Sequence, residues 1–498
     1  MANKDNRIIK VNTAEKMIAI MLMVILTACV GLLLYVGRYN CLNVGDDFIY
    51  AKAGQQVWNS THSVFAMFKY AIADSINMWK TWQGLYFDNM LYAFLLGMFA
   101  ENGMAFSAYF SLLPLAVCGL MAGIIVFKEV LGMDLSKAVI ITIPVILFQI
   151  MYTPSPSEGF YWPGSAINHT LTYALFELSF AVWLYIVRGS DKNKLVVAKV
   201  MAVCLCVMIG GGSYVSAVPM ICVVILMVIY AFAIKSKEKY YLLGLMVFFL
   251  VCLGFNVMSP GAKVRQEDAG ETYRWWEAIL MSFVEAIKYI KNWSAFAEVI
   301  ILLVLMIPAS IESTLKLKFN FKYPWLVTLL TFGIYASQFT PCLYSLRDIG
   351  TYRVQNIYRF SLYVLLCANL WYWCGFVVKK IEDGLVKKLE SYKFGGLVLL
   401  VASVVVIGGF SLFILKTSGD TMTIKSALYS LKSGQFENYY QENQIRKEIL
   451  TNPEEDEVYI DRFSKPPYLI NINDVAEDGN WYNVILENYY DKKAIHAK

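Results

Sequence analysis

The stretch MIAIMLMVILTACVGLLLYV, residues 17–36, is twenty residues long and carries no charged side chain. An α-helix of that length matches the hydrocarbon thickness of a bilayer and exceeds an ordinary signal-peptide core. Basic side chains precede it at Lys4, Arg7, Lys10 and Lys16, which is typical of a cytoplasmic flank. The sequence therefore predicts a retained first membrane-spanning helix with its N-terminus in the cytoplasm.

A lipoprotein signal is the alternative for this stretch, because Leu26-Thr27-Ala28-Cys29 resembles a lipoprotein cleavage site. A mature lipoprotein would turn polar after the cysteine, whereas the apolar run here continues for seven more residues, to Val36. The spanning helix is therefore the favoured interpretation.

The whole chain is also rich in apolar residues. Of its 498 residues, 58% are hydrophobic and 16% are charged, and the mean hydropathy is +0.51. Apolar runs of spanning or nearly spanning length begin near residues 17, 104, 138, 168, 197, 215, 240, 295, 324, 357 and 394. This pattern predicts an all-α polytopic membrane protein with about 11 transmembrane helices, within a range of 10–13.

The basic residues predict the orientation of the loops. They cluster at Lys128 and Lys137 and within residues 188–199, 235–239, 316–322 and 379–393. These clusters fall in alternate loops, so we expect those loops to be cytoplasmic and assign the net charge of +5 to topology rather than to nucleic-acid binding. The outward loops are then residues 37–103, 152–168, 259–292 and 340–356.

Residues 85–100 are apolar but short for a membrane crossing. Counting them as a full span would place every later lysine cluster outside, so we predict an interfacial or re-entrant helix. After the last apolar run, the polar and tyrosine-rich residues 417–498 predict a small extracytoplasmic C-terminal subdomain beside a transmembrane domain of residues 1–416. The sequence does not show which outward loop this subdomain contacts.

Asp46 and Asp47 are adjacent carboxylates just outside the first apolar run, flanked by Gly45, Phe48 and Tyr50. Two carboxylates held this close titrate as a coupled pair, which suits a general base or the ligands of a divalent cation such as Mg²⁺ or Mn²⁺. The alternative is a solvated polar cap on a helix end. Which aspartate would be the base is open, with a slight preference for Asp47, which the two aromatic residues could desolvate.

Five cations lie in or beside the later outward loops, against the usual bias of positive charge toward the cytoplasm. They are Lys263, Arg265, Arg347, Arg353 and Arg359. Guanidinium groups bind phosphate in a bidentate manner, so these side chains are candidates for a phosphate site. Salt bridges to neighbouring carboxylates are the alternative.

Aromatic and polar side chains in the same loops are candidates for binding a sugar. Trp82 and Trp162 each stand beside a glycine-containing turn, and Tyr161, Asn168 and His169 lie close to the second tryptophan. Anchoring at the membrane interface explains most aromatic residues in such loops. We predict that the two tryptophans stack on sugar rings.

Two features within the predicted spans are unusual. Glu177 is a carboxyl in an apolar run, so it is expected either to line a cavity or to be protonated and hydrogen-bonded. The run Gly210-Gly211-Gly212-Ser213 is expected to interrupt a helix for close packing, because no P-loop lysine follows it. The ten cysteines and three histidines form no metal-spaced cluster, and Cys41 with Cys342 is a candidate disulfide.

Several short motifs, in this order, resemble an uncharacterised bacterial multi-spanning membrane family that is similar to the GT-C glycosyltransferases. They are Asp46-Asp47, Trp82-Gln83-Gly84, Tyr161-Trp162 to Asn168, Pro260-Gly261 with Arg265, Pro466-Pro467, Trp481-Tyr482-Asn483 and Tyr489-Tyr490. The chain departs from the family pattern at Leu85, Ala262 and Ser165, which concerns the details of donor binding.

The resemblance implies an inverting glycosyltransferase of a bacterial cytoplasmic membrane. Such an enzyme takes a sugar from a polyprenyl-phosphate donor, which another membrane enzyme supplies, and passes it to a glycan, lipid or protein acceptor on the outer face. The family places an acidic base or metal ligand where Asp46 and Asp47 lie, and Lys263, Arg265 and Arg353 would stabilise the leaving phosphate. The alternatives are a flippase or transporter of lipid-linked glycans and a glycan ligase or polymerase that uses a diphosphate-linked donor.

Overall fold

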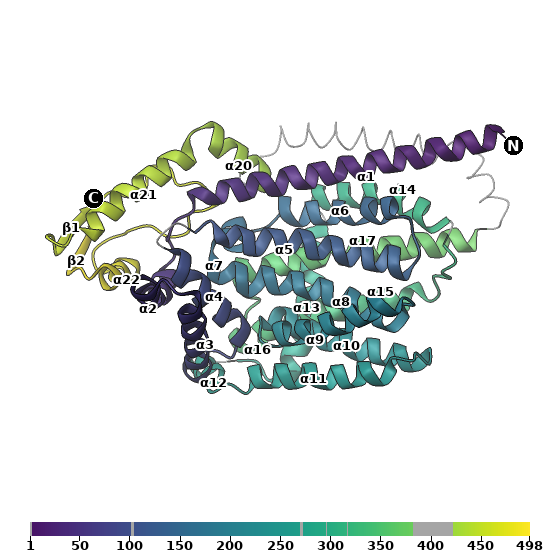
Figure 1. Ribbon diagram of the computed structural model, residues 1–498, viewed down its shortest axis with the longest axis horizontal. Coiled ribbons are helices and arrows are strands. Elements are labelled where there is room, and N and C mark those ends of the chain that lie inside the picture. The colour runs from purple at the N-terminus through teal and green to yellow at the C-terminus, as the bar shows by residue number, and fades with distance from the viewer. Residues whose placement is uncertain (1, 101–103, 269–271, 295, 316, 382–421) are drawn as a thin grey trace.

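The computed structural model describes residues 2–100, 104–268, 272–294, 296–315, 317–381 and 422–498. Most of its helices run side by side in an elongated bundle (Figure 1). The N-terminus lies at one end of this bundle, and the C-terminal helices and strands gather at the opposite end. We call this second end the loop end.

Nine helical segments of the described residues are long and apolar enough to cross a membrane. They are Thr13–Tyr39, Phe106–Val130, Pro163–Arg188, Lys192–Gly210, Tyr214–Ala233, Lys239–Val257, Ala297–Leu315, Pro324–Leu346 and Tyr352–Lys380. A further apolar helix, Leu135–Met151, is shorter. The prediction of a multi-pass, α-helical membrane protein is confirmed, while the apolar run predicted near residue 394 lies outside the described residues.

The elements of the bundle follow the apolar runs. In chain order they are α1 (Ala2–Val36), η1 (Gly37–Tyr39), α5 (Phe106–Gly123), η3 (Ile124–Val130), α6 (Leu135–Met151), η5 (Ala166–Leu171), α8 (Thr172–Arg188), α9 (Lys192–Gly210), α10 (Tyr214–Ala233), α11 (Lys239–Val257), α14 (Ala297–Leu315), α15 (Pro324–Ser337) and α17 (Tyr352–Lys380).

Helices also occupy the four segments predicted to face outward. They are α2 (Gly45–Thr61), α3 (Val64–Thr81), α4 (Tyr86–Phe99), η4 (Ser157–Tyr161), α7 (Pro163–Ser165), α12 (Pro260–Asp268), α13 (Trp275–Ser294) and α16 (Thr340–Leu346). Of these, α2, α3, α4, α7, α12 and α16 lie at the loop end (Figure 1). Segments far apart in the sequence are thus brought to one end of the bundle.

Helix α4 is the short apolar segment whose placement the sequence left ambiguous. It has 14 residues and is not one of the nine segments long enough to cross a membrane. It packs against α2 and α3 rather than running the length of the bundle. Its first turn carries Asp88, which is completely buried.

The glycine run 210–212 separates α9 from α10 and lets α4 approach the bundle. A Cβ atom at Gly211 would overlap the ring of Tyr86, and a Cβ atom at Gly212 would overlap the side chain of Thr172. A larger residue at Gly211 would push the start of α4 outward. The predicted role of the glycines in close packing is therefore confirmed.

The C-terminal segment contains α20 (Thr423–Lys432), α21 (Gln435–Thr451), β1 (Glu457–Ile460), α22 (Trp481–Tyr490) and β2 (Ala494–Ala497). The two strands pair in parallel. Phe48 of α2 belongs to the apolar core of this segment, and its ring centroid lies 5.0 Å from that of Tyr489. The C-terminal segment thus packs against helix α2, a contact that the sequence did not predict. The predicted domain boundary between residues 416 and 417 lies outside the described residues.

The candidate disulfide between Cys41 and Cys342 is wrong, because both thiols are free and buried in different surroundings. Cys41 contacts Asn443 of α21, whereas Cys342 contacts Tyr358 of α17.

Candidate functional site

Asp47 lies in the first turn of α2 and its side chain is only 1% exposed. Its Oδ1 atom accepts hydrogen bonds from the Tyr92 hydroxyl at 2.6 Å and from the Trp162 indole N–H at 3.0 Å. Burial, together with the neighbouring charge of Asp46, raises the pKa of Asp47 to about 7, although the two hydrogen bonds act to lower it. Asp47 is therefore a fixed carboxyl that changes protonation state near neutral pH.

Asp46, the other member of the pair, is exposed. It interacts electrostatically with Arg353 at the start of α17, and Arg353 in turn with Arg265 of α12. The guanidinium of Arg353 lies 4.9 Å from the ring centroid of Trp162 and 3.7 Å from a carboxylate oxygen of Glu158. A carboxylate open to solvent thus stands near two cations, which suits a ligand that carries both a hydroxyl and a phosphate.

Arg265 is held by the segment between α3 and α4. It donates a hydrogen bond to Gln83, and Gln83 donates one to Asn89 at 2.7 Å. The Arg265 guanidinium also lies 5.5 Å from the ring centroid of Trp82. A Cβ atom at Gly261 would overlap the backbone nitrogen of Trp82, so the Pro-Gly and Trp-Gln-Gly motifs pack directly against each other.

A second buried carboxyl, Asp88, lies behind these residues. It accepts a hydrogen bond from the Thr172 hydroxyl at 3.2 Å and another from the backbone N–H of Ser213. Burial raises the pKa of Asp88 well above its usual range. The Ser213 hydroxyl lies 3.0 Å from Nδ1 of His169, which is within electrostatic range of Arg265. Asp88 of α4 is therefore hydrogen-bonded to two bundle segments, and through Ser213 it is linked to His169, which lies near Arg265.

Two predicted residues have structural partners away from the acid pair. The Tyr161 hydroxyl donates to the Leu33 carbonyl at 2.9 Å, and the side chain is 2% exposed. Arg359 is equally buried and forms an ion pair with Glu298 at 2.6 Å. The charge of Arg359 is therefore already neutralised inside the protein.

Arg347, Lys263 and Asn168 are the remaining candidates. Arg347 is exposed, and its guanidinium lies 5.0 Å from the ring centroid of Tyr273. Lys263 is exposed on α12, two residues before Arg265. The side-chain oxygen of Asn168 is buried without a hydrogen-bond partner among the described residues.

The two tryptophans differ in exposure. Trp82 is 37% exposed, so its ring is accessible to a ligand. Trp162 is 9% exposed; its N–H donates to Asp47, and Arg353 lies over its ring. Its contacts position the acid pair rather than present an open stacking surface.

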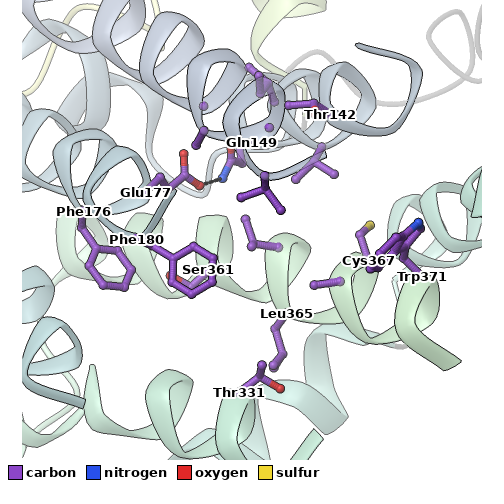
Figure 2. Close-up of a pocket in the computed structure, with 18 of the residues that line it drawn as sticks. Thr142, Gln149, Phe176, Glu177, Phe180, Thr331, Ser361, Leu365, Cys367 and Trp371 are labelled. Atoms are coloured by element: carbon purple, nitrogen blue, oxygen red, sulfur yellow. Dashed lines mark hydrogen bonds between the residues drawn. The ribbon is translucent and has the colours of Figure 1, made fainter. Parts of the chain in front are cut away.

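Glu177 lines a cavity of about 290 Å³ within the bundle. Figure 2 shows it pointing toward Gln149, whose side-chain amide donates to it at 2.8 Å. Phe176, Phe180 and Trp371 contribute to the largely apolar wall. The second carboxylate oxygen of Glu177 and the amide oxygen of Gln149 have no hydrogen-bond partner among the described residues.

The acid pair was also a candidate site for Mg²⁺ or Mn²⁺. The described part of the chain contains no group of three or more histidine, cysteine, aspartate or glutamate side chains arranged to hold a metal ion. Oδ1 of Asp47 already accepts two hydrogen bonds, and Arg353 lies within electrostatic range of Asp46. The surroundings of Asp46 thus include a cation, and the step proposed below uses Asp46 as a base rather than as a metal ligand.

Sequence reasoning missed Tyr92, Asp88 and Asn89. All three lie in α4, the short apolar helix. The available signal was the Asp-Asn pair inside an apolar segment, since a polar pair in such surroundings is costly unless it is used. Glu158 was missed because it lies in a predicted outward loop, where a carboxylate is common and gives no sign of a function.

No protein-family model, curated protein or solved structure matches the chain. The resemblance to the GT-C glycosyltransferases therefore stays a prediction.

Proposed function

We propose that the protein is a membrane glycosyltransferase that moves a sugar from a polyprenyl-phosphate donor to a glycan, lipid or protein acceptor. The observation that carries the proposal is the exposed Asp46 within electrostatic range of Arg353, which is itself within range of Arg265, at the loop end of an apolar bundle. A base must meet a phosphate-binding group at the membrane surface in this reaction, because the donor is a lipid. The proposed topology has eleven crossings, a cytoplasmic N-terminus and the loop end on the outer face of a bacterial cytoplasmic membrane.

Transfer would proceed as a single in-line displacement. The acceptor hydroxyl oxygen forms a bond to the anomeric carbon of the sugar while the bond from that carbon to the phosphate oxygen breaks. The electron pair of the broken bond leaves on the polyprenyl phosphate, the hydroxyl proton passes to Asp46, and the configuration at the anomeric carbon is inverted. Arg265 and Arg353 stabilise the negative charge of the leaving phosphate.

Asp47 would act as a positioning residue in this scheme. A base must be within reach of the proton that it abstracts, and Asp46 is the exposed carboxylate of the pair. Asp47 is held by Tyr92 and Trp162, so it fixes the first turn of α2. Its negative charge, once formed, lies next to the proposed base, so turnover is expected to depend on the protonation state of Asp47.

The cavity beside Glu177 supports a lipid donor, since a largely apolar space between membrane helices could hold part of a prenyl chain. Residues of α17 line this cavity, and the same helix begins beside Arg353. The phosphate and the chain of one donor molecule could therefore contact different parts of a single helix.

The proposal is tested by measuring release of polyprenyl phosphate in nanodiscs from short-chain polyprenyl-phosphate sugars, with a set of sugars presented one at a time. We expect release with at least one sugar and its loss in the Asp46→Asn variant. Asp134→Asn is a matched control, because Asp134 is exposed, precedes α6 and is remote in sequence from the acid pair. Release that persists unchanged in Asp46→Asn would exclude the proposed base.

A transporter of lipid-linked glycans is the second candidate, and Glu177 in its intramembrane cavity is the observation that favours it. A transporter would move the intact lipid across a vesicle membrane without splitting it. Movement that depends on Glu177 and is indifferent to Asp46 would select this function instead. A ligase or polymerase differs from the transferase only in using a diphosphate-linked donor, which the same release assay distinguishes.

A further inference from the structure

A second cavity lies between α2 and α21, on the side of the C-terminal segment. Its volume is about 680 Å³, within the roughly 300–1,000 Å³ typical of small-molecule sites. We call it the α2–α21 cleft. None of the residues proposed for sugar transfer lines it.

The wall that α2 contributes is a polar stripe. Lys52, Gln55, Gln56 and Asn59 line the cleft, and their spacing places all four on one face of the helix. Lys52 pairs with Asp491 at 2.7 Å, so its position is fixed at the rim. This face of α2 is polar although a helix packed against another element usually turns an apolar face toward it.

The wall that α21 contributes has the same character. Tyr440, Asn443, Gln444 and Lys447 line the cleft at helical spacings of three and four residues. Two polar helix faces are thus turned toward a shared space.

The inner wall comes from α22, where Tyr489 and Tyr490 line the cleft. The Tyr489 hydroxyl donates to the side-chain oxygen of Gln55, which is 6% exposed. The side-chain nitrogen of Gln55 is buried and has no acceptor among the described residues. A buried donor without an acceptor is unfavourable, so a rotation of the Gln55 side chain that turns this nitrogen toward the cleft would let a ligand accept its hydrogen bond.

The lining selects for a ligand with many small groups that both donate and accept hydrogen bonds. Five carboxamide side chains line the cleft, and each offers a donor and an acceptor at one position; they are Gln55, Gln56, Asn59, Asn443 and Gln444. Three tyrosines add rings with a polar tip. The described lining holds two lysines and no carboxylate, so it disfavours cationic ligands.

We propose that the α2–α21 cleft binds a saccharide of two or three units, as part of a glycan acceptor. Sugar hydroxyl and acetamido groups match the carboxamides, and the three tyrosine rings give the apolar faces of sugar rings a surface to pack on. Only the role of the saccharide as acceptor rests on the proposed transferase activity, because binding requires no transfer.

The cleft holds the part of the glycan that does not react. Gln55 follows Asp46 by nine residues, which is two and a half helical turns, so the two side chains point to opposite sides of α2. Phe48 packs against Tyr489 and Tyr490 and lies next to Asp47, so the α22 wall of the cleft reaches the first turn of α2. A bound glycan would extend around this end of the helix toward the acid pair.

The test is equilibrium binding to the full-length protein in nanodiscs free of sugar-based detergent, without any donor. The probes are maltotriose, the N-acetylglucosamine trimer and the cationic glucosamine trimer. We expect saturable binding of at least one neutral trisaccharide, at least tenfold tighter than that of the cationic trimer. Absence of saturable binding by both neutral probes would overturn the inference, as would tighter binding of an uncharged glycine-serine peptide.

Two variants locate the site. Gln444→Trp should fill the cleft from an exposed position on α21 and weaken binding at least tenfold, and Gln55→Leu removes the buried amide. Gln441→Trp is the matched control, because it changes an exposed glutamine of the same helix that does not line the cleft, and binding should stay within twofold. Binding that Gln444→Trp leaves unchanged would place the saccharide elsewhere.

The two proposals fail separately. If polyprenyl phosphate is released through Asp46 but no saccharide binds, only the cleft proposal is wrong. If a saccharide binds and Gln444→Trp removes it, but no donor is split, the cleft stands and the transferase proposal fails.

Discussion

Two carboxyl groups inside the protein lie in different surroundings. Asp47 lies at the loop end, and Glu177 lies within the bundle. Each accepts hydrogen bonds from uncharged side chains. Asp47 has an exposed carboxylate beside it and guanidinium groups nearby, whereas Glu177 faces a largely apolar cavity. Burial of an ionisable side chain therefore does not by itself indicate which reaction it serves. The charged side chains around it decide whether the site could bind an anionic substrate.

Removing one carboxylate from each of these two regions, Asp46 at the loop end and Glu177 in the bundle, is the strongest way to break this comparison. Asp46→Asn should lower the turnover number about 10²- to 10⁴-fold, the usual contribution of a general base. Glu177→Gln keeps the shape of the side chain and should change turnover less than tenfold. Steady-state release of polyprenyl phosphate measures both, and an equal loss in the two variants would contradict the distinction.

Two arginines on α17 sharpen the comparison further. Arg353→Ala should lower turnover about 10²- to 10³-fold, because it removes a cation from the leaving phosphate. Arg359→Ala should instead destabilise the protein by about 3 kcal/mol, because it leaves the Glu298 carboxylate, which is only 16% exposed, without its partner. Turnover and thermal unfolding, measured on both variants, separate the two effects. A loss of turnover in folded Arg359→Ala protein as large as that in Arg353→Ala would show that both arginines serve the reaction.

The pH dependence tests the position of Asp47. Because its pKa is about 7 in the folded protein, turnover should fall as the pH drops below 7 and Asp47 becomes protonated. Tyr92→Phe removes a hydrogen bond that lowers this pKa, so the acid limb of the pH profile should move to higher pH. An unchanged acid limb in Tyr92→Phe would assign the titration to another group.

The titration of Asp47 should also affect the stability of the folded protein, which should fall, rather than rise, as the pH increases. The folded-state pKa of Asp47 lies above its usual value of 3.8, so folding favours the protonated form. The stability that this provides is present below about pH 4 and is lost as the pH rises through 7. The melting temperature should therefore decline over that range in the wild type, and the decline should be smaller in Asp47→Asn.

The smallest expected effect concerns metals. The proposed displacement uses Asp46 as a base and two arginines at the phosphate, without a metal ion, so EDTA should change turnover less than twofold. Activity that EDTA abolishes and Mg²⁺ or Mn²⁺ restores would show that a divalent ion belongs to the site.

Much of the bundle was predictable from apolar runs, because twenty helical residues are needed to cross a bilayer and leave a contiguous signal. The acid pair, Trp162, Arg265 and Arg353 could also be identified, since charge and aromatic residues in outward loops stand out against an apolar chain. Arg359 shows the limit of this reasoning. Its spacing from Arg353 resembles a repeated cation, yet its ion pair with Glu298 depends on a helix sixty residues away in the sequence.

The sequence by itself determined that the chain is a multi-pass helical membrane protein, because hydrophobic length and charge are local properties. The tertiary structure alone decided that Asp47 is buried by Tyr92 and Trp162, that Phe48 joins the core of the C-terminal segment, and that α2 and α21 enclose a polar cleft. These facts depend on which faces of distant helices meet. Short motifs carry no information about such pairings, because burial and the pKa of a carboxyl are set by neighbours in space.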